Sequence, residues 1–297
     1  MKEIVVLSGK GGTGKTSLTA SFALLAGTSA VIADCDVDAS DMHLLLAPKA
    51  EREEMFYSGK EAVIDSDACI SCNRCLEVCH FDAVETDGTL YEINPVNCEG
   101  CSYCERVCPT DAITMKPSLA GDWYVSTIRS GAKMVHARLG IGAENSGKLV
   151  ARVKNEAKDL ASEESKALVL VDGSPGIGCP VVSSLSGANY IVIVTEPTVS
   201  GLHDLKRLRE LIVKFRLPSG CIINKADLNT GYRDEILRYL EQEEMDILGT
   251  LPYDEKITAA MVQGKSILEE PYSDSETAEL IRDIWRKIQS GVGLDRE

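Results

Sequence analysis

The chain has 297 residues, of which 44% are hydrophobic and 26% are charged, a composition typical of a globular protein and not of a disordered one. Its formal net charge of -15 disfavours partners such as nucleic acid and anionic membranes, because the field of the whole molecule repels both. No apolar run reaches the roughly 18 residues that cross a bilayer, and the opening MKEIVVLSGK lacks the pattern of a signal peptide, so we expect a cytoplasmic protein without a stable membrane anchor.

The N-terminal segment alternates between apolar runs and a helical pattern. Residues 2–8 form an apolar run, residues 15–26 have the small and aliphatic residues of a helix, and residues 30–34 form a second apolar run. A strand, a helix and a strand in this order begin a βαβ unit. Such units predict a parallel sheet with helices on both faces.

A glycine-rich loop joins the first predicted strand to the first predicted helix. Residues 9–16, GKGGTGKT, satisfy the pattern GxxxxGK[ST], in which backbone N–H groups surround phosphate oxygens at the start of a helix. Lys15 is expected to neutralise the β- and γ-phosphates of ATP, and the Thr16 hydroxyl to bind Mg²⁺. A glycine-rich turn without a ligand is the alternative. The residues expected to bind the nucleotide here are Gly11, Gly12, Thr13, Gly14, Lys15, Thr16 and Ser17.

Between residues 61 and 118 the chain becomes rich in cysteine and in turn-forming residues. Eight of the 11 cysteines fall here, in two runs with the same spacing, C-x2-C-x2-C-x3-C. Residues 67–84 match residues 96–113 in every cysteine and in the Asp-Ala-aliphatic triplet that follows. We therefore expect an inserted module with an internal repeat, each half a short hairpin and a helix, which divides its host into residues 1–60 and 119–297.

The two cysteine runs predict iron–sulfur clusters. Their spacing is that of bacterial two-cluster ferredoxins, in which the fourth cysteine of each run binds the other cluster. Zinc is the alternative, but it needs two CxxC pairs per ion, and the triple runs disfavour it. His80 stands where proline is usual and could alter the potential of the second cluster. The expected ligands are Cys69, Cys72, Cys75 and Cys108 for the first [4Fe–4S] cluster, and Cys79, Cys98, Cys101 and Cys104 for the second.

The α/β pattern resumes after this module. Unbroken apolar runs at 167–172 and 190–196 are typical of strands buried on both faces, and a further strand is expected within 219–227. The expected fold class is therefore α/β, with a doubly wound, mostly parallel sheet and an inserted ferredoxin-like α+β module. Helical patterns occupy residues 201–215, 232–244 and 276–289.

Acidic residues follow two of the predicted strands. Asp172 ends the run at 167–172, the position of a Walker B carboxylate that binds Mg²⁺ directly or through water. Asp34, Asp36 and Asp38 follow the second strand. A carboxylate there could instead cap the next helix, but three aspartates spaced two apart exceed what a cap needs.

Lys10 distinguishes this loop from an ordinary phosphate loop. The sequence KGGTGKT at 10–16 resembles the deviant Walker A motif of the MinD/ParA/nitrogenase iron protein superfamily. The resemblance implies that Lys10 reaches the nucleotide of a second subunit, with an exposed loop lysine as the alternative. It also implies that the active unit is a nucleotide-dependent homodimer, or a heterodimer with a homologous subunit, and that Lys10, Lys15 and Asp36 act in catalysis.

Other segments are similar to the same family. Residues 33–46 are similar to its switch I, in which Asp36, with Asp38 as the near rival, orients the attacking water. Residues 172–178, DGSPGIG, are similar to its switch II, whose glycine N–H senses the γ-phosphate. These likenesses imply an ATPase whose loops respond to the state of the nucleotide.

Two later loops are similar to those that recognise adenine. Asn224 begins the segment NKAD after a predicted strand and is the expected base contact. Asp254 lies in the segment PYD, which is similar to a second loop on the adenine side. An ordinary turn is the alternative for both, because short Asn, Asp and Pro sequences also form turns.

Together the motifs resemble one subgroup, the MinD-superfamily ATPases that contain an inserted ferredoxin domain. The resemblance implies ATP or ADP, Mg²⁺ and two [4Fe–4S] clusters as cofactors. ATP-gated electron transfer to a redox partner is the preferred function, because eight complete thiolate ligands suit saturated clusters better than a scaffold. Assembly of iron–sulfur or metallocofactor centres on a client protein is the alternative.

A third function, MinD/ParA-like positioning, needs a surface to bind. The last predicted helix places apolar residues on one face, and acidic residues balance the basic ones on its polar face. This charge pattern favours a helix that docks on the protein over one that binds a membrane. The apolar residues are Leu280, Ile281, Ile284, Trp285 and Ile288.

Overall fold

The chain forms two compact units in the computed structural model, which describes residues 1–38, 41–140, 142 and 146–294. Unit 1 comprises Met1–Glu53, Trp123–Arg138 and Ser146–Glu297, and unit 2 comprises Glu54–Asp122 and Leu139–Asn145. The module predicted at 61–118 lies within unit 2, whose bounds are wider. Residues 39 and 40 of the predicted switch I segment lie outside the described residues.

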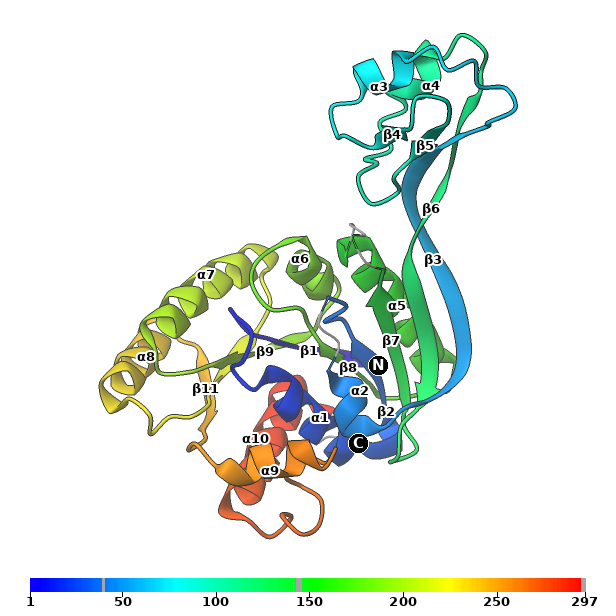
Figure 1. The fold of residues 1–297 in the computed structure, drawn as a ribbon. Helices are drawn as coiled ribbons and strands as arrows, with labels where there is room; N and C mark the ends of the chain where they lie inside the picture. The colour runs from blue at the N-terminus through cyan, green and yellow to red at the C-terminus, as the bar shows by residue number, and fades with distance from the viewer. Residues whose placement is uncertain (39–40, 141, 143–145, 295–297) are drawn as a thin grey trace. The chain divides into compact units, whose positions relative to one another are not determined.

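One sheet of nine strands has the order β11-β10-β9-β1-β8-β2-β7-β6-β3 (Figure 1). Every neighbouring pair from β11 to β7 is parallel. The prediction of a large, mostly parallel sheet is therefore confirmed. The parallel strands are β1 (Lys2–Leu7), β2 (Ala30–Asp34), β7 (Lys133–Leu139), β8 (Leu168–Asp172), β9 (Tyr190–Thr195), β10 (Ser219–Ile223) and β11 (Asp246–Thr250).

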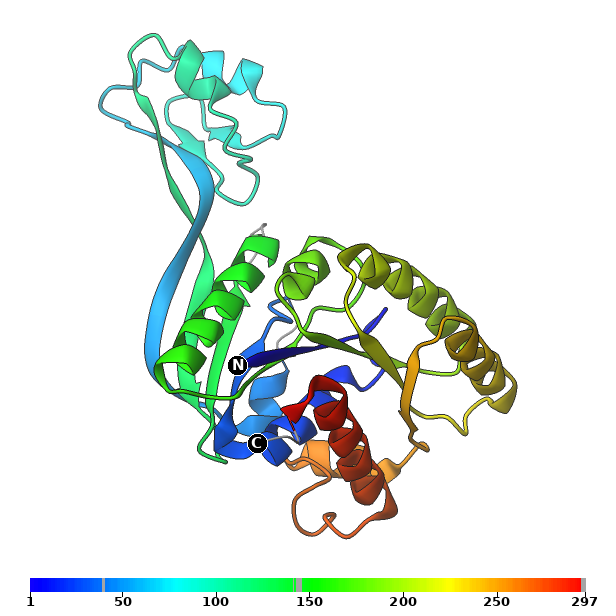
Figure 2. The ribbon, with the colours of Figure 1, turned by 180° about the vertical axis from the view of Figure 1, so that it is seen from behind.

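Helices cover both faces of the sheet in unit 1, as the two views of the ribbon show (Figures 1 and 2). Successive side chains of a strand point to opposite faces, so a continuous apolar run supplies both layers. On one face lie α1 (Lys15–Ala26), α2 (Met42–Leu46), α9 (Glu255–Val262) and α10 (Glu276–Val292). On the other lie α5 (Ser146–Glu163), α6 (Cys179–Leu185), α7 (Val199–Phe215) and α8 (Thr230–Gln242).

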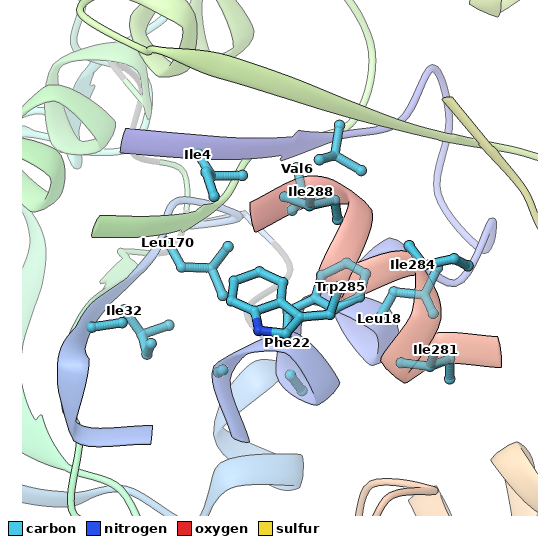
Figure 3. Packing of buried hydrophobic residues seen from close by; sticks show 14 of the residues in the cluster. Ile4, Val6, Leu18, Phe22, Ile32, Leu170, Ile281, Ile284, Trp285 and Ile288 are labelled. Atoms are coloured by element: carbon cyan, nitrogen blue, oxygen red, sulfur yellow. The ribbon is translucent and has the colours of Figure 1, made fainter. Parts of the chain in front are cut away.

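The apolar face of α10 is buried in the core. Phe22 of α1 stacks on Trp285 of α10 with ring centroids 5.4 Å apart, next to Ile4 and Val6 of β1 (Figure 3). Ile281, Ile284 and Ile288 belong to the same cluster. The prediction that this helix docks on the protein is confirmed, because its apolar face is already covered. None of the helices in the described residues is long and apolar enough to span a bilayer.

Two long strands connect the units and were not predicted. They are β3 (Lys49–Ile64) and β6 (Ile113–Thr127). Most of β3 is exposed, and its sequence KAEREEMFYSGKEAVI therefore lacks the apolar alternation that marks a half-buried strand. The pairing of the two strands depends on neighbours distant in the sequence.

Unit 2 keeps the internal repeat in its backbone. It contains α3 (Arg74–Val78), α4 (Tyr103–Val107) and one antiparallel hairpin of β4 (Val84–Thr86) and β5 (Tyr91–Ile93). The expected hairpin in each half was therefore wrong: each half has its helix, but this hairpin joins the two halves. Left-handed residues recur at equivalent positions, as the pairs Ser71 and Gly100, Asn73 and Ser102, and Asp82 and Asp111.

Replacing Trp285 by alanine should destabilise unit 1 by about 3–5 kcal/mol, because it leaves a cavity beside Phe22. Urea unfolding followed by circular dichroism measures the change. Arg286→Ala is the matched control on the same helix, since the Arg286 side chain is 68% exposed, and it should alter stability by no more than about 0.5 kcal/mol. Equal effects of the two substitutions would contradict the packing described here.

Candidate functional site

A cavity of about 570 Å³ opens in unit 1 at the carboxyl ends of the central strands. Ser8 follows β1, Asp36 follows β2 and Asn224 follows β10, and all three line it. Open α/β sheets bind their ligands at this edge, where the strand order reverses. Besides Asp36 and Asn224, the predicted residues that line the cavity are Gly11, Gly12, Thr13, Gly14, Lys15, Thr16, Ser17 and Asp254.

The phosphate loop has the backbone that its glycines predict. Gly12 and Gly14 have φ values of 79° and 90°, in the left-handed region that favours glycine. A Cβ atom on Gly14 would lie 2.4 Å from Nδ2 of Asn224, so a side chain at this position would displace that amide. The hydroxyl of Thr13 is buried without a hydrogen-bond partner. The loop thus holds a buried polar group that has no partner among the residues that the structure describes.

Lys15 is the centre of a buried charge network. Its Nζ lies 2.8 Å from Oδ1 of Asp172 and 3.4 Å from Oδ2 of Asp36, and the lysine side chain is only 5% exposed. Burial by itself would lower the pKa of Lys15, but the negative charges of Asp172 and Asp36 outweigh it and raise that pKa. The lysine is therefore a cation held among carboxylates.

Asp172 is fully buried and accepts hydrogen bonds from α1. The Thr16 hydroxyl donates to its Oδ2 over 2.8 Å, and the Thr19 hydroxyl donates to its Oδ1 over 2.9 Å. A hydroxyl beside a carboxylate is the oxygen donor set that Mg²⁺ takes next to phosphates. The sequence indicated Thr16 and Asp172, whereas Thr19 was missed, although its position one helical turn after Lys15 is a usable signal.

Asp36 is held in an unfavourable setting for a carboxylate. Burial is the largest cause that raises its pKa above the usual range, Lys15 acts against it, and the charge of Asp172 adds to it. Asp38 is exposed and does not line the cavity. Of the two aspartates predicted to orient water, the structure places Asp36 in the cavity beside Lys15.

Lys10 is engaged within its own chain. Its Nζ lies 2.7 Å from Oε1 of Glu196 and donates to the Ser200 hydroxyl over 2.8 Å. Lys225 approaches the other oxygen of Glu196 at 3.2 Å and donates to the carbonyl of Gly12 over 2.9 Å. Burial would raise the pKa of Glu196, but hydrogen bonds from the two lysines lower it. Glu196 follows β9 as Asp172 ends β8, a signal that the sequence reasoning did not use.

The far end of the cavity combines amide and apolar groups. Asn224 donates to the carbonyl of Thr13 over 2.8 Å, so its side chain also supports the phosphate loop. Both Asp254 oxygens accept hydrogen bonds, one from the backbone of Lys256 and one from the Thr277 hydroxyl. Asp254 therefore caps α9, and the apolar lining is supplied by Leu44, Leu45, Tyr253, Ile257 and Met261.

The segment after Asp172 is tied to its neighbours through the backbone. Gly176 donates its N–H to the carbonyl of Ser8 over 2.9 Å, and the Ser174 hydroxyl donates to the carbonyl of Cys35 over 2.6 Å. The predicted switch II segment thus contacts both the start of the phosphate loop and the chain after β2. A displacement of the phosphate loop or of the chain after β2 would therefore act on this segment.

Two cavities in unit 2 are lined by the clustered cysteines. Cys69, Cys72 and Cys75 line the first cavity together with Cys108 from the second run. Cys98, Cys101 and Cys104 line the other together with Cys79 from the first run. These groups are the two ligand sets that the sequence predicts. His80 lines neither cavity.

The pKa values of the clustered thiols are shifted in different directions. Burial raises the pKa of Cys75 and of Cys104, which occupy equivalent positions. Burial also acts upward on Cys108, but hydrogen bonds from the Thr110 backbone and hydroxyl outweigh it and lower the pKa of Cys108. In the part of the chain that the structure describes, no three His, Cys, Asp or Glu side chains are arranged to hold a metal ion.

Comparison with known proteins places this site in a family. The model of the CobQ/CobB/MinD/ParA nucleotide binding domain matches residues 4–267. An uncharacterized protein of Methanocaldococcus jannaschii, MJ0578, is 32% identical over 293 residues, which is 98% of this chain and 97% of that protein. The septum site-determining protein MinD of Bacillus subtilis is 26% identical over 46% of this chain and 52% of its own length.

Solved structures agree on the fold. The septum site-determining protein MinD of Pyrococcus horikoshii, solved in complex with Mg-ADP, covers 100% of this chain and 99% of its own, with a TM-score of 0.61 and 17% identity. The cell division ATPase MinD of Pyrococcus furiosus gives a TM-score of 0.57 at 17% identity, over 97% of this chain and 98% of its own.

Asp36→Asn should stabilise the nucleotide-free protein at pH 7. The folded-state pKa of Asp36 is raised, so its ionised form costs stability above that pKa, and the cost disappears as pH falls below the usual carboxyl value of about 3.9. Melting temperatures across pH measure the gain, which should vanish in acid. ATP hydrolysis by this variant should fall by about 10²-fold or more.

Asp38→Asn is the matched control, because Asp38 is exposed two residues away. It should leave both the melting temperature and hydrolysis near their original values. Loss of hydrolysis in Asp38→Asn with normal hydrolysis in Asp36→Asn would reverse the assignment of the two aspartates.

Proposed function

The chain belongs to the CobQ/CobB/MinD/ParA nucleotide-binding family, and on that premise we propose that this ATPase couples its nucleotide state to electron transfer through two [4Fe–4S] clusters in unit 2. The observation that carries the proposal is the pair of thiol-lined cavities. Each is lined by three cysteines of one run and the fourth of the other. This crossed arrangement is the one that two-cluster ferredoxins use.

The donor chemistry fits clusters better than zinc. A single zinc ion draws four thiolates around one point, whereas a cubane separates its four thiolates by the width of the cluster. Each cavity is lined by the three thiols of one CxxCxxC run and one thiol of the other run, and not by the two CxxC pairs that a zinc ion takes. Cys72 and Cys101 are exposed, so each set has one thiol at the surface. When bound, the clusters would supply one-electron redox chemistry at these positions.

On binding of Mg-ATP, the contacts of Lys15 with carboxylates would be replaced by contacts with phosphates. Thr16 and Asp172 would supply the oxygen ligands for Mg²⁺, and the Lys15 ammonium, here held by Asp172 and Asp36, would turn to the β- and γ-phosphates. The Asp36 carboxylate would then be free to orient the attacking water. The buried Thr13 hydroxyl, which has no partner among the described residues, would gain one from the phosphates.

A covalent path joins the nucleotide site to unit 2. Helix α2, which contributes Leu44 and Leu45 to the nucleotide cavity, leads within a few residues into β3, and β3 continues into unit 2. The chain returns through β6 to the turn that contains Arg129. Arg129 donates to the carbonyls of Leu45 and Leu46 at the end of α2. The two connections made by β3 and β6 are thus attached to a helix that lines the site.

A second contact fixes the returning strand to the helix before β8. Trp123 of β6 is buried between the guanidinium groups of Arg52 and Arg152, at 4.8 and 4.3 Å from its ring centre. Glu156 of α5 forms ion pairs with both arginines. Helix α5 leads directly to β8, which ends at Asp172. A shift of α5 on Mg-ATP binding would therefore act on the base of both connecting strands.

Two other functions have some support. The surface thiols Cys72 and Cys101 would make the clusters accessible for assembly of a centre on a client protein. The likeness to MinD proteins favours positioning, although the apolar face of α10 is covered by the core. Transfer of iron and sulfide to an apo-protein on ATP addition would favour assembly. Normal ATPase cycling in a Cys69→Ser, Cys98→Ser variant without iron would favour positioning.

Anaerobically purified protein should contain about eight iron atoms and eight sulfides per chain. The midpoint potentials of its clusters, or the rate of electron transfer to an artificial acceptor, should differ between the ADP and ATP states. Lys15→Ala, which cannot hold the phosphates, should lose this difference while it keeps the iron. Arg129→Ala should keep both the iron and ATP binding but reduce the difference. Potentials and rates indifferent to the nucleotide would exclude ATP-coupled electron transfer.

Lys10→Ala should abolish ATP-dependent dimerisation and reduce hydrolysis to background, because a lysine released from Glu196 would reach the nucleotide of the partner subunit. Light scattering and phosphate release measure the two effects, and visible absorption should show both clusters intact. Lys214→Ala, an exposed lysine at the end of α7, is the control and should behave as the original protein. Normal dimerisation and turnover in Lys10→Ala would remove the shared-site arrangement.

A further inference from the structure

The two thiol cavities of unit 2 are lined by equivalent residues of the internal repeat. Three matched pairs of lining residues, among others, are Ile64 and Ile93, Ala112 and Ala83, and Ile113 and Val84. These apolar walls are alike in the two cavities. Any difference in the electrostatic environment therefore comes from the few pairs whose chemistry differs.

The first difference is charge. Arg74 lines the first cavity, and its equivalent in the second is Tyr103. Glu99 lines the second cavity, and its equivalent in the first is Ile70. One cavity thus has a cation and the other an anion. Both charged side chains are exposed, so solvent screens their effect without changing its sign.

The second difference is a hydroxyl group within reach of a cysteine sulfur. Thr110 lines the first cavity, and its Oγ1 lies 3.7 Å from Sγ of Cys108, within reach of an O–H···S hydrogen bond. Its equivalent in the second cavity is Phe81, whose ring offers no donor to Cys79. Two charges that differ between the halves, Glu77 and Arg106, line neither cavity.

A cubane gains one negative charge when it accepts an electron, and nearby cations and hydrogen bonds to sulfur make that step more favourable. The cation and the hydroxyl both belong to the first cavity, and the anion belongs to the second. From this, resting on the clusters of the proposed function, we infer that the site of Cys69, Cys72, Cys75 and Cys108 has the higher reduction potential. An electron from a one-electron donor therefore ends at this site. If the donor first reduces the site of Cys79, Cys98, Cys101 and Cys104, the electron then passes from that site to the site of higher potential.

The test is a redox titration of the full chain, with dithionite as reductant and electron paramagnetic resonance as readout. Two one-electron steps are expected. Arg74→Gln and Thr110→Val should each shift the higher-potential step toward lower potential, and Arg74→Gln should change the ratio of the two reduced sites by about 2- to 5-fold. Glu99→Gln should shift only the lower-potential step, toward higher potential. Glu92→Gln is the matched control, an exposed acid on β5 that lines neither cavity, and should shift neither step.

The assignment is overturned if Arg74→Gln shifts the lower-potential step, if Glu99→Gln shifts the higher-potential one, or if none of the three variants differs from Glu92→Gln. Iron and sulfide are measured for every variant, so that loss of a cluster is not mistaken for a shift. A chain that binds no iron overturns both this inference and the proposed function. Two clusters in the opposite order overturn this inference alone.

Discussion

The site in unit 1 depends on a buried ammonium group held between two carboxylates. The Lys15 side chain is almost fully buried, and its positive charge faces the carboxylates of Asp172 and Asp36 at the ends of neighbouring strands. Replacing Lys15 by a neutral residue would leave two buried carboxylates without their cation, which costs several kcal/mol. Without a ligand, Lys15 is a shared cation for the two carboxylates. Bound phosphates can replace the carboxylates as the anionic partners of Lys15, and Mg²⁺ can replace Lys15 as the cationic partner of the carboxylates.

The exchange of these contacts also explains how nucleotide binding can affect distant parts of unit 1. Asp172 contacts α1 through Thr16 and Thr19, the segment after it contacts the phosphate loop, and Asp36 lies on the path to α2. Helix α2 is in turn held by Arg129, in the turn that follows β6. The strands that lead to unit 2 therefore start from elements whose contacts the nucleotide would alter. The coupling proposed above therefore depends on these hydrogen bonds of unit 1.

Unit 2 shows how a repeat can produce two sites that are alike in architecture and unlike in chemistry. The helices and left-handed residues recur at equivalent positions because the cysteine spacing constrains the backbone. Side chains that only line the cavities are under no such constraint. Where the second cavity has Tyr103 and Phe81, the first has Arg74 and Thr110. These differences alter the electrostatic field at one site and leave the thiol arrangement intact.

By itself the sequence determined the features whose geometry is local. The phosphate loop, the acids that follow buried strands and the two cysteine runs are specified by short spacings, and the parallel strands β1, β2, β8, β9 and β10 by continuous apolar runs. Strands β7 and β11 were not predicted. Only the tertiary structure decided which distant groups meet, such as Glu196 with Lys10 and Arg129 with the end of α2. It also revealed β3 and β6, whose exposed and charged residues carry no strand pattern. The physical reason is that a motif fixes the backbone over a few residues, whereas a pairing between remote side chains depends on how the elements pack.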